Sequence, residues 1–374
     1  NVEALNGVGS VGNISRHRSA PLVVKVDNGY AVKYFPVISG ESIAHGYQVL
    51  LAEIGKGRGL PIGKRSMNGE LLKFTDDYLL EEEGIAPPNI PSDKGGKKRQ
   101  GKEEKTKISK ENIAKIARIE TRRLEVEIMN KDYVADVGGF LYAGENPVKR
   151  TSVFQVSYMV PAYGISAEVA SLESQLHVRY SSTYKSSQLN PEEEEGGQGG
   201  QRGRAYQLPY NVDVGSALYS VTFNIDLDQI ATPSNAGVDE EEVKGDTELL
   251  NMLNKLKNEE SKLASQKKTR QEVALLAFAR LFENLEFGAK KSRFFPLATL
   301  EEAVITLTDK PFVVTPAVSN NYLSSTVNRL EKMRSLNLVK PVILGVVGTK
   351  KPSNEFQEFN SIAEAVETLL QALK

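Results

Sequence analysis

The sequence predicts an α+β fold whose core is a split βαβ sheet. Two strand–helix–strand segments lead to this prediction, one near the start of the chain and one near its end. A long region of uneven composition separates them, which indicates that large inserts interrupt the core. We expect the helices of this core to lie on one face of the sheet.

The first part of the chain predicts a β-hairpin followed by a helix. Alternating strands between Leu22 and Val37 flank Asp27-Asn28-Gly29, which is a strong tight-turn signal. The next helix ends in the glycine-rich run 55–59. Its apolar residues share one helical face, at Ile43, Tyr47, Leu50, Leu51 and Ile54.

The region after this helix is less regular. Residues 60–118 resemble an insertion, and 93–110 within them is rich in Lys and Gly, which is typical of a mobile loop. We expect a half-buried strand at 124–128. A strand, a turn and a second strand follow across 137–159.

Two further strands are predicted before the chain becomes helical. They span 175–180 and 217–225, and between them residues 190–205 form a low-complexity loop with four consecutive glutamates. Residues 246–287 then show the helical period, and we expect two helices there.

The last part of the chain repeats the order strand, helix, strand, helix. We expect strands at 303–307 and 342–347 and a helix at 322–333 between them. The final helix begins with a capping box from Ser361 to Glu364. This order is typical of a ferredoxin-like or RNA-recognition-motif-like (RRM-like) core.

Composition limits the classes of function. Lys and Arg (47) nearly cancel Asp and Glu (48), which argues against a surface that is basic everywhere and permits a local basic track. The chain has no cysteine, which excludes disulfides and thiolate metal sites. No apolar run approaches the roughly 18 residues that span a bilayer, and we expect a cytoplasmic protein with no membrane partner.

The most informative candidate site is a glycine-rich loop, residues 6–15, that continues into Arg16-His17-Arg18. Glycines let backbone N–H groups approach a ligand, and two nearby arginines can contact successive phosphates. The alternative is a solvated loop with ordinary surface arginines, and residue types alone do not separate the two.

The start of the first helix is a second candidate. Ser39 and Gly40 offer unpaired amides and the positive end of the helix dipole, which together attract anions. The commoner alternative is that Ser39 only caps the helix. His45 lies off the apolar stripe and faces either a ligand or solvent.

A third candidate is the strand at 175–180. Its alternation places Gln175, His177 and Arg179 on one face. Three hydrogen-bonding side chains in a row suit a nucleic-acid groove, and an ordinary solvent-facing strand is the alternative.

A fourth candidate is the basic cluster of Lys290, Lys291 and Arg293, which follows a helix exit. Cations beside Phe294 and Phe295 fit a phosphate-binding loop with a stacking ring. The alternative is charge matching at the helix C-terminus, and we expect both phenylalanines to enter the core.

Catalysis has little support in the sequence. The chain has three histidines, no cysteine and no His pair at metal-binding spacing, so we expect neither a metal nor a cofactor. His17 and His177 are the only candidate acid/base pair, for RNA cleavage, and they are far apart in sequence. We expect no enzyme.

Several of these segments also carry a family resemblance. They are Asn6–Arg18, Pro36–Gln48, Asp136–Gly144 with Val148–Ser152, Gln175–Tyr180 and Lys291–Pro296. Together, and in this order, they resemble the backbone subunits of archaeal type I-A CRISPR Cascade complexes, within the DevR-like autoregulator family of the RAMP superfamily. The resemblance spans nearly the whole chain.

The resemblance implies an RRM-like palm, here residues 1–59 and 206–374, with finger and thumb elements inserted at 60–205. The inserts at 93–110 and 190–205 look longer than is usual in the family. It also implies antiviral defence: copies of the subunit stack head-to-tail along a guide RNA (crRNA), beside other Cascade subunits, and present its bases to a target DNA strand.

The resemblance implies a set of RNA-binding residues and no catalytic ones. Relatives in type III complexes cut RNA with an aspartate in the first loop, and the loop 6–18 has none. A guide-processing endoribonuclease, as some RAMP relatives are, is the alternative. The implied RNA-binding residues are Asn13, Arg16, His17, Arg18, Ser39, Gly40, Lys149, Arg150, His177, Arg179, Lys290, Lys291 and Arg293.

Overall fold

The computed structural model describes residues 3–11, 14–71, 74–91, 109–162, 170–181, 206–292, 295–296, 298–318 and 320–373. The elements used below are β1 (Gly7–Val11), β2 (Ile14–His17), β3 (Ser19–Val26), β4 (Gly29–Pro36), α1 (Gly40–Gly57), α2 (Lys64–Met67), α3 (Asp77–Glu82), α4 (Lys110–Lys131), α5 (Tyr133–Gly138), β5 (Phe140–Tyr142), β6 (Val148–Arg150), β7 (Phe154–Val156), β8 (Val160–Pro161), β9 (Ser171–Ser181), β10 (Tyr206–Ser216), β11 (Tyr219–Ser220), β12 (Phe223–Ile225), α6 (Glu240–Val243), α7 (Thr247–Ser265), α8 (Lys267–Glu283), β13 (Ala303–Thr308), α9 (Tyr322–Ser335), β14 (Pro341–Val347), β15 (Gln357–Phe359) and α10 (Ile362–Ala372), with one 3₁₀ turn at Leu227–Gln229.

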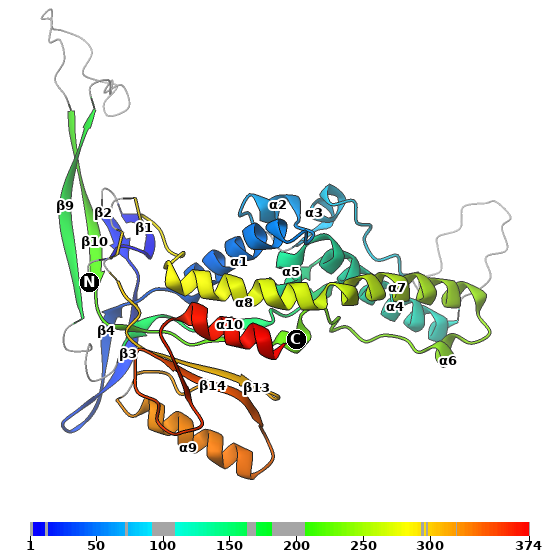
Figure 1. Ribbon diagram of the computed structural model, residues 1–374. Helices are drawn as coiled ribbons and strands as arrows, with labels where there is room; N and C mark the ends of the chain where they lie inside the picture. The colour runs from blue at the N-terminus through cyan, green and yellow to red at the C-terminus, as the bar shows by residue number, and fades with distance from the viewer. Residues whose placement is uncertain are drawn as a thin grey trace, which may run out of the picture.

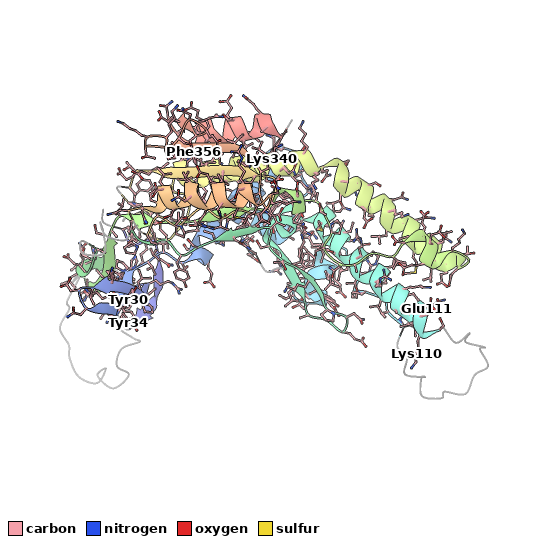
Figure 2. The ribbon with its side chains drawn as sticks, turned by 90° about the horizontal axis from the view of Figure 1, so that it is seen from below. Tyr30, Tyr34, Lys110, Glu111, Lys340 and Phe356 are labelled. Carbon is pink, nitrogen blue, oxygen red and sulfur yellow. The ribbon has the colours of Figure 1, made fainter. Side chains whose placement is uncertain are left out.

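The molecule is an arch. Seen from below (Figure 2), the β3–β4 hairpin, marked by Tyr30 and Tyr34, lies at one end, and the first residues of α4, Lys110 and Glu111, lie at the other. Helix α8 runs through the middle with α1 on one side and α10 on the other (Figure 1). The long β9–β10 ribbon projects away from the helices.

Helix α1 confirms the predicted cap and stop. The Ser39 hydroxyl accepts a hydrogen bond from the backbone N–H of Ser42 at 3.3 Å, and the helix ends at Gly57. Its apolar face packs on α8, where the Tyr47 hydroxyl donates to the carbonyl of Ala274 at 3.0 Å. Gly46 lies so close to the backbone of Glu286 that a Cβ has no room.

A buried ionic network joins the inserted region to α8. Asp136 of α5 accepts from Arg150 of β6 at 2.6 Å and from Arg270 of α8 at 2.8 Å. Arg150 also lies 3.2 Å from the carboxylate of Glu125 in α4. All four side chains are at most 1% exposed, so these groups satisfy one another away from water.

The strand expected at 124–128 is wrong, because these residues belong to α4. The alternation that suggested a strand has a physical cause. Leu124 and Ile128 pack in one hydrophobic cluster, while Val126 packs in the main core, and all three are fully buried. A helix enclosed between two clusters is apolar on more than one face and loses the simple helical period.

The strand–turn–strand expected across 137–159 is confirmed only in part. Residues 137 and 138 end helix α5, and strands β5 and β7 follow. The strand expected at 217–225 is divided into β11 and β12. The strand at 175–180 and the two helices within 246–287 are confirmed as β9, α7 and α8.

The C-terminal part confirms the predicted order of elements. Strands β13, β14 and β15 form a three-stranded sheet, and Ser361 caps α10 by accepting from the N–H of Glu364 at 3.1 Å. The Glu364 carboxylate accepts from the N–H of Asn360, so the second half of the capping box is displaced by one residue. Ile343 packs towards α10 and Leu344 towards α9. Helices therefore cover both faces of this sheet, unlike the expected single face.

The described residues thus form a mixed α+β fold with six small sheets of two to four strands. An RRM-like core is not confirmed by this topology. The loop expected at 190–205, and residues 93–108 of the loop expected at 93–110, lie outside the described residues. None of the described helices combines the length and apolar character needed to cross a membrane.

Candidate nucleic-acid interface

One sheet brings two of the predicted segments together. Its strand order is β1-β2-β10-β9, with β2 parallel to β10 and β10 antiparallel to β9. Arg16 lies on β2 and His177 on β9, so one strand separates them. Neighbouring strands lie about 4.8 Å apart, which places the two segments roughly 10 Å apart across the sheet.

Arg16 is an exposed cation on this sheet. Its side chain is 54% exposed and its guanidinium lies 3.6 Å from the carboxylate of Asp213, which is 5% exposed on β10. The carboxylate orients the guanidinium and leaves several of its five N–H donors towards solvent. Arg16 is therefore available for an anionic ligand.

His17 points the other way, into the protein. Its Nε2 lies 2.7 Å from Glu3 Oε1 and its Nδ1 lies 2.7 Å from the carbonyl oxygen of Arg18. Burial lowers the pKa of His17, but the hydrogen bond and charge of Glu3 outweigh burial and raise that pKa overall. Because both ring nitrogens face acceptors, the imidazolium form fits the site. The side chain of His17 has no exposed surface, so it is closed to a ligand.

Asn6 connects three of the predicted segments. Its carbonyl oxygen accepts from the N–H of Arg18 at 2.8 Å, and its side-chain oxygen accepts from the N–H of Ser39 at 2.8 Å. The adjacent Leu5 carbonyl accepts from the N–H of Ala289 at 2.8 Å. The first loop, the start of α1 and the segment after α8 therefore meet around Asn6.

The start of α1 positions this junction and is not itself open. Ser39 is 2% exposed and caps the helix. A Cβ added at Gly40 would come within 2.9 Å of the carbonyl oxygen of Val156, so β7 covers the first turn. Ser39 therefore acts as the helix cap, which was the alternative to anion binding. Its backbone N–H already donates to the side-chain oxygen of Asn6.

In the basic segment after α8, Lys290 lies beside the first loop and Lys291 contacts the end of the helix. The ammonium of Lys290 lies 4.0 Å from the position that a Cβ would take at Gly7, which places this lysine beside the first loop. Lys291 donates to the carbonyl of Leu285 at 2.9 Å and so matches the negative end of α8. Arg293 and Phe294 lie outside the described residues. Phe295 is 63% exposed, so its expected place in the core is wrong.

Four further predicted residues lie on other strands: Lys149 and Arg150 on β6, and His177 and Arg179 on β9. On β6, Lys149 is exposed while Arg150 is 3% exposed inside the ionic network, where it cannot reach RNA. On β9, the His177 ring is half-buried and stacks on Tyr210 with centroids 5.5 Å apart. The side chain of Arg179 and the whole of Asn13 lie outside the described residues.

The two histidines do not form an acid/base pair. His17 is enclosed with both nitrogens engaged, and His177 lies on a strand that β10 separates from β2. This geometry gives no support to RNA cleavage by these residues. Among the residues that the structure describes, no cluster of three His, Asp or Glu side chains is arranged to hold a metal ion.

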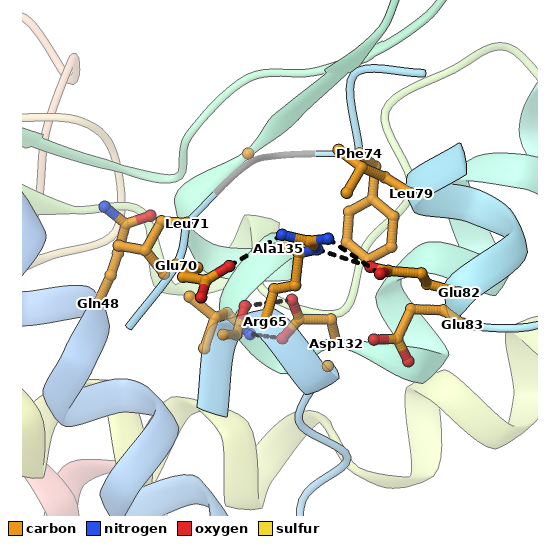
Figure 3. Close-up of a pocket in the computed structure, with 14 residues that line it drawn as sticks. Gln48, Arg65, Glu70, Leu71, Phe74, Leu79, Glu82, Glu83, Asp132 and Ala135 are labelled. Carbon is orange, nitrogen blue, oxygen red and sulfur yellow. Dashed lines mark hydrogen bonds and ion pairs between the residues drawn. The ribbon is translucent and has the colours of Figure 1, made fainter. Parts of the chain in front are cut away.

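A separate pocket lies between α2, α3 and α5 (Figure 3). Arg65 crosses it and contacts Glu70 at 2.9 Å and Glu82 at 2.6 Å. Asp132, on its floor, accepts from Ser66 at 2.6 Å, and burial raises the pKa of this carboxyl. Carboxylates outnumber the one guanidinium, so this pocket is unsuited to a polyanion.

Sequence reasoning missed the carboxylates that orient the site. Glu3 contacts His17, and Asp213 contacts Arg16. Glu3 lies outside the strand that carries His17, and Asp213 lies on β10, far from Arg16 in sequence. Asp213 did leave a signal, since it stands between Val212 and Val214 in an apolar strand that buries it. No local signal marked Glu3.

Comparison with known proteins gives a consistent result. The family model "CRISPR-associated negative auto-regulator DevR/Csa2" matches residues 1–327. The "CRISPR-associated aCascade subunit Cas7/Csa2 2" of Saccharolobus solfataricus is 37% identical over 377 residues, covering 100% of this chain and 96% of that protein. The "CRISPR-associated protein Cas7/Csa2 1" of the same organism is 31% identical, covering 92% of this chain and 88% of that protein.

Three further similarities are more distant. A Thermoproteus tenax protein, "CRISPR-associated protein Cas7/Cst2/DevR", is 24% identical and covers 83% of this chain and 72% of its own length. Among solved structures, a chain of a "CRISPR RNA-guided surveillance complex" aligns with a TM-score of 0.33 at 15% identity, covering 69% of this chain and 85% of that chain. A pre-nicking form of such a complex aligns with a TM-score of 0.37 at 12% identity, covering 100% and 98%.

Proposed function

The chain belongs to the CRISPR-associated DevR/Csa2 family, and from this premise we propose that it is a backbone subunit of a type I-A Cascade surveillance complex. In this role it binds the sugar–phosphate backbone of a guide RNA and leaves the bases free to pair with a target DNA strand. The protein then needs no sequence specificity of its own, because base pairing supplies it.

One observation carries this proposal: an unsatisfied N–H group of the Arg18 side chain, at the junction formed by Asn6. Within the described part of the chain, the Nε of Arg18 is buried and has no hydrogen-bond partner. A buried N–H without an acceptor is costly, and a phosphate oxygen would satisfy it. Arg16 and Lys290 lie beside the same loop, so the anion would meet three cations.

The predicted RNA-binding residues take two roles in this proposal. We assign the contacts with phosphate and sugar to Asn13, Arg16, Arg18, Lys149, His177, Arg179, Lys290 and Arg293. The others support the fold: His17, Ser39, Gly40 and Lys291 around the junction, and Arg150 in the buried ionic network.

The proposal includes an assembly. We propose that residues 1–59 and 206–374 form an RRM-like palm and residues 60–205 the finger and thumb elements. Copies join head-to-tail in the cytoplasm, alongside other Cascade subunits, and a contact of this heterologous kind that does not close produces an open helical filament. The subunit is a holder of RNA and not a nuclease.

Removing Arg16 and Arg18 tests the groove. The double change to alanine should weaken single-stranded RNA binding and lower the slope of log affinity against log salt by about 1.4, since each lost phosphate contact contributes about 0.7. The control removes the same charge elsewhere, with Arg334→Ala and Lys340→Ala in the C-terminal part. Equal affinities and slopes for the two double variants would remove this loop from the RNA site.

A further inference from the structure

The β3–β4 hairpin carries an unusual exposed face. The strand register pairs Val23 with Val32 and Lys25 with Tyr30, so their side chains share one side of the ribbon with Tyr34. On this side Val23 is 63% exposed, Tyr30 77%, Val32 62% and Tyr34 73%. We name these four residues the tyrosine face, and Figure 2 shows its two tyrosines at one end of the arch.

The other side of the hairpin is anchored to the protein. Val24 and Phe35 point that way and are 6% and 5% exposed. The ribbon is therefore held by one face while the opposite, equally apolar face stays open. Two tyrosines and two valines at these exposures present on the order of 500 Å² of largely apolar side chain, which is large for a surface without a partner.

Charge around the tyrosine face indicates the kind of partner. Lys25 lies across from Tyr30 on the same face, whereas Lys33 pairs with Leu22 on the opposite side of the ribbon. The one carboxylate of the hairpin sequence is Asp27, in the turn. At its root the ribbon continues directly into Arg16-His17-Arg18, where Arg16 is exposed. Aromatic rings beside a lysine, on a ribbon continuous with an arginine cluster, are complementary to a single-stranded nucleic acid.

The spacing of the two rings fits stacked bases. Tyr30 and Tyr34 are four residues apart on one strand, which corresponds to about 13 Å. Side chains stand roughly perpendicular to a strand pair, and bases stack at about 3.4 Å, so two such rings can bracket a run of about three bases. Val23 and Val32 lie between the rings and form an apolar floor.

We propose that the tyrosine face is a base-stacking platform, on which Tyr30 and Tyr34 bracket about three bases of a single-stranded nucleic acid. The identity of that strand as guide RNA or as its complementary DNA rests on the proposed function, whereas stacking itself does not. The platform adds a contact to bases where the groove at Arg16 and Arg18 contacts phosphates.

The test uses the full chain and twelve-nucleotide single strands, one of RNA and one of DNA, each with a central 2-aminopurine whose fluorescence falls on stacking. The chain has no tryptophan, so the probe can be excited with little protein background. In the variant Tyr30→Leu/Tyr34→Leu we expect about tenfold or greater weakening and loss of the quench. Tyr30→Phe/Tyr34→Phe should keep both, because it keeps the rings.

Matched controls separate stacking from other causes. Tyr78→Leu removes a tyrosine that is 61% exposed on α3, outside the hairpin, and should leave the quench unchanged. Wild-type quench and affinity in the double leucine variant would overturn the proposal. So would an unchanged quench combined with lost self-association in sedimentation, because leucine would then have disturbed a contact between copies.

The two strands distinguish this inference from the proposed function. Quenching of DNA but not RNA, lost in the double leucine variant, would leave the platform standing and refute guide-RNA binding. RNA binding that depends on Arg16 and Arg18 but shows no quench would support guide-RNA binding and refute the platform. Absence of quench with both strands would refute the platform.

Discussion

The buried ionic network makes the sharpest stability prediction. In the change Asp136→Asn, one carboxylate oxygen becomes an NH₂ group that faces a guanidinium. Asp136 accepts from Arg150 at 2.6 Å, from Arg270 at 2.8 Å and from the N–H of Ala231 at 3.1 Å. Arg270 is 0% exposed and would keep only the carbonyl of Met129 and the side chain of Gln266 as partners.

The magnitude follows from the burial of this site. Breaking a fully buried pair by removing one charge costs about 3–5 kcal/mol, because the remaining charge stays away from water. A folded domain is stable by roughly 5–15 kcal/mol in total, so this single change should lower the urea midpoint strongly. The measurement is urea unfolding followed by circular dichroism at pH 7.

Two companion variants sharpen the test. Glu355→Gln breaks the ion pair between Arg334, which is 53% exposed, and Glu355, which is 58% exposed. Because this pair lies in solvent, the change should cost less than about 1 kcal/mol of unfolding free energy. Adding Arg270→Met to Asp136→Asn removes the unpaired cation and should recover at least about 1 kcal/mol. A loss for Asp136→Asn as small as that for Glu355→Gln would refute the description of this network.

Three further predictions concern the groove and its support. Because the pKa of His17 is raised and that of Glu3 is lowered, their ion pair stabilises the fold above the ordinary Glu pKa of 4.5, and this stabilisation is lost as pH rises through the folded-state pKa of His17, above 6.5. The difference in unfolding free energy between wild type and His17→Gln should therefore shrink from pH 6 to pH 9. A difference that stays constant over this range would contradict the pairing. Gly46→Ala should destabilise by about 1–3 kcal/mol because the backbone after α8 fills the space, while Gly57→Ala, with open space around it, should be neutral or slightly stabilising; equal thermal shifts would argue against the close contact. Lys290→Ala should reduce the salt slope of RNA binding by about 0.7, and an unchanged slope would place this lysine outside the groove.

Much of the fold was predictable because its signals are local. The hairpin turn at Asp27-Asn28-Gly29, the cap at Ser39 and the amphipathic α10 each depend on neighbours within a few residues. Helix α4 was not predictable in the same way. Its residues 124–128 are buried on several sides, so the chain shows no single apolar stripe there.

The candidate site was predictable as a set of segments but not residue by residue. The loop at 6–18, the start of α1 and the segment after α8 do meet around Asn6. The sequence could not show that His17 and Arg150 turn inward, because their partners Glu3 and Asp136 are found only by tertiary packing. A basic residue type indicates an affinity for phosphate, and the partners that the fold supplies decide whether its charge remains available.

The most direct test of the central claim is the affinity of the purified chain for a single-stranded RNA of arbitrary sequence, measured from low to high salt. The proposed role predicts binding that is independent of sequence, falls steeply with salt and is accompanied by RNA that co-purifies, visible as a raised ratio of absorbance at 260 nm to 280 nm. A chain that carries no nucleic acid, and whose RNA affinity is weak and insensitive to salt, would contradict it.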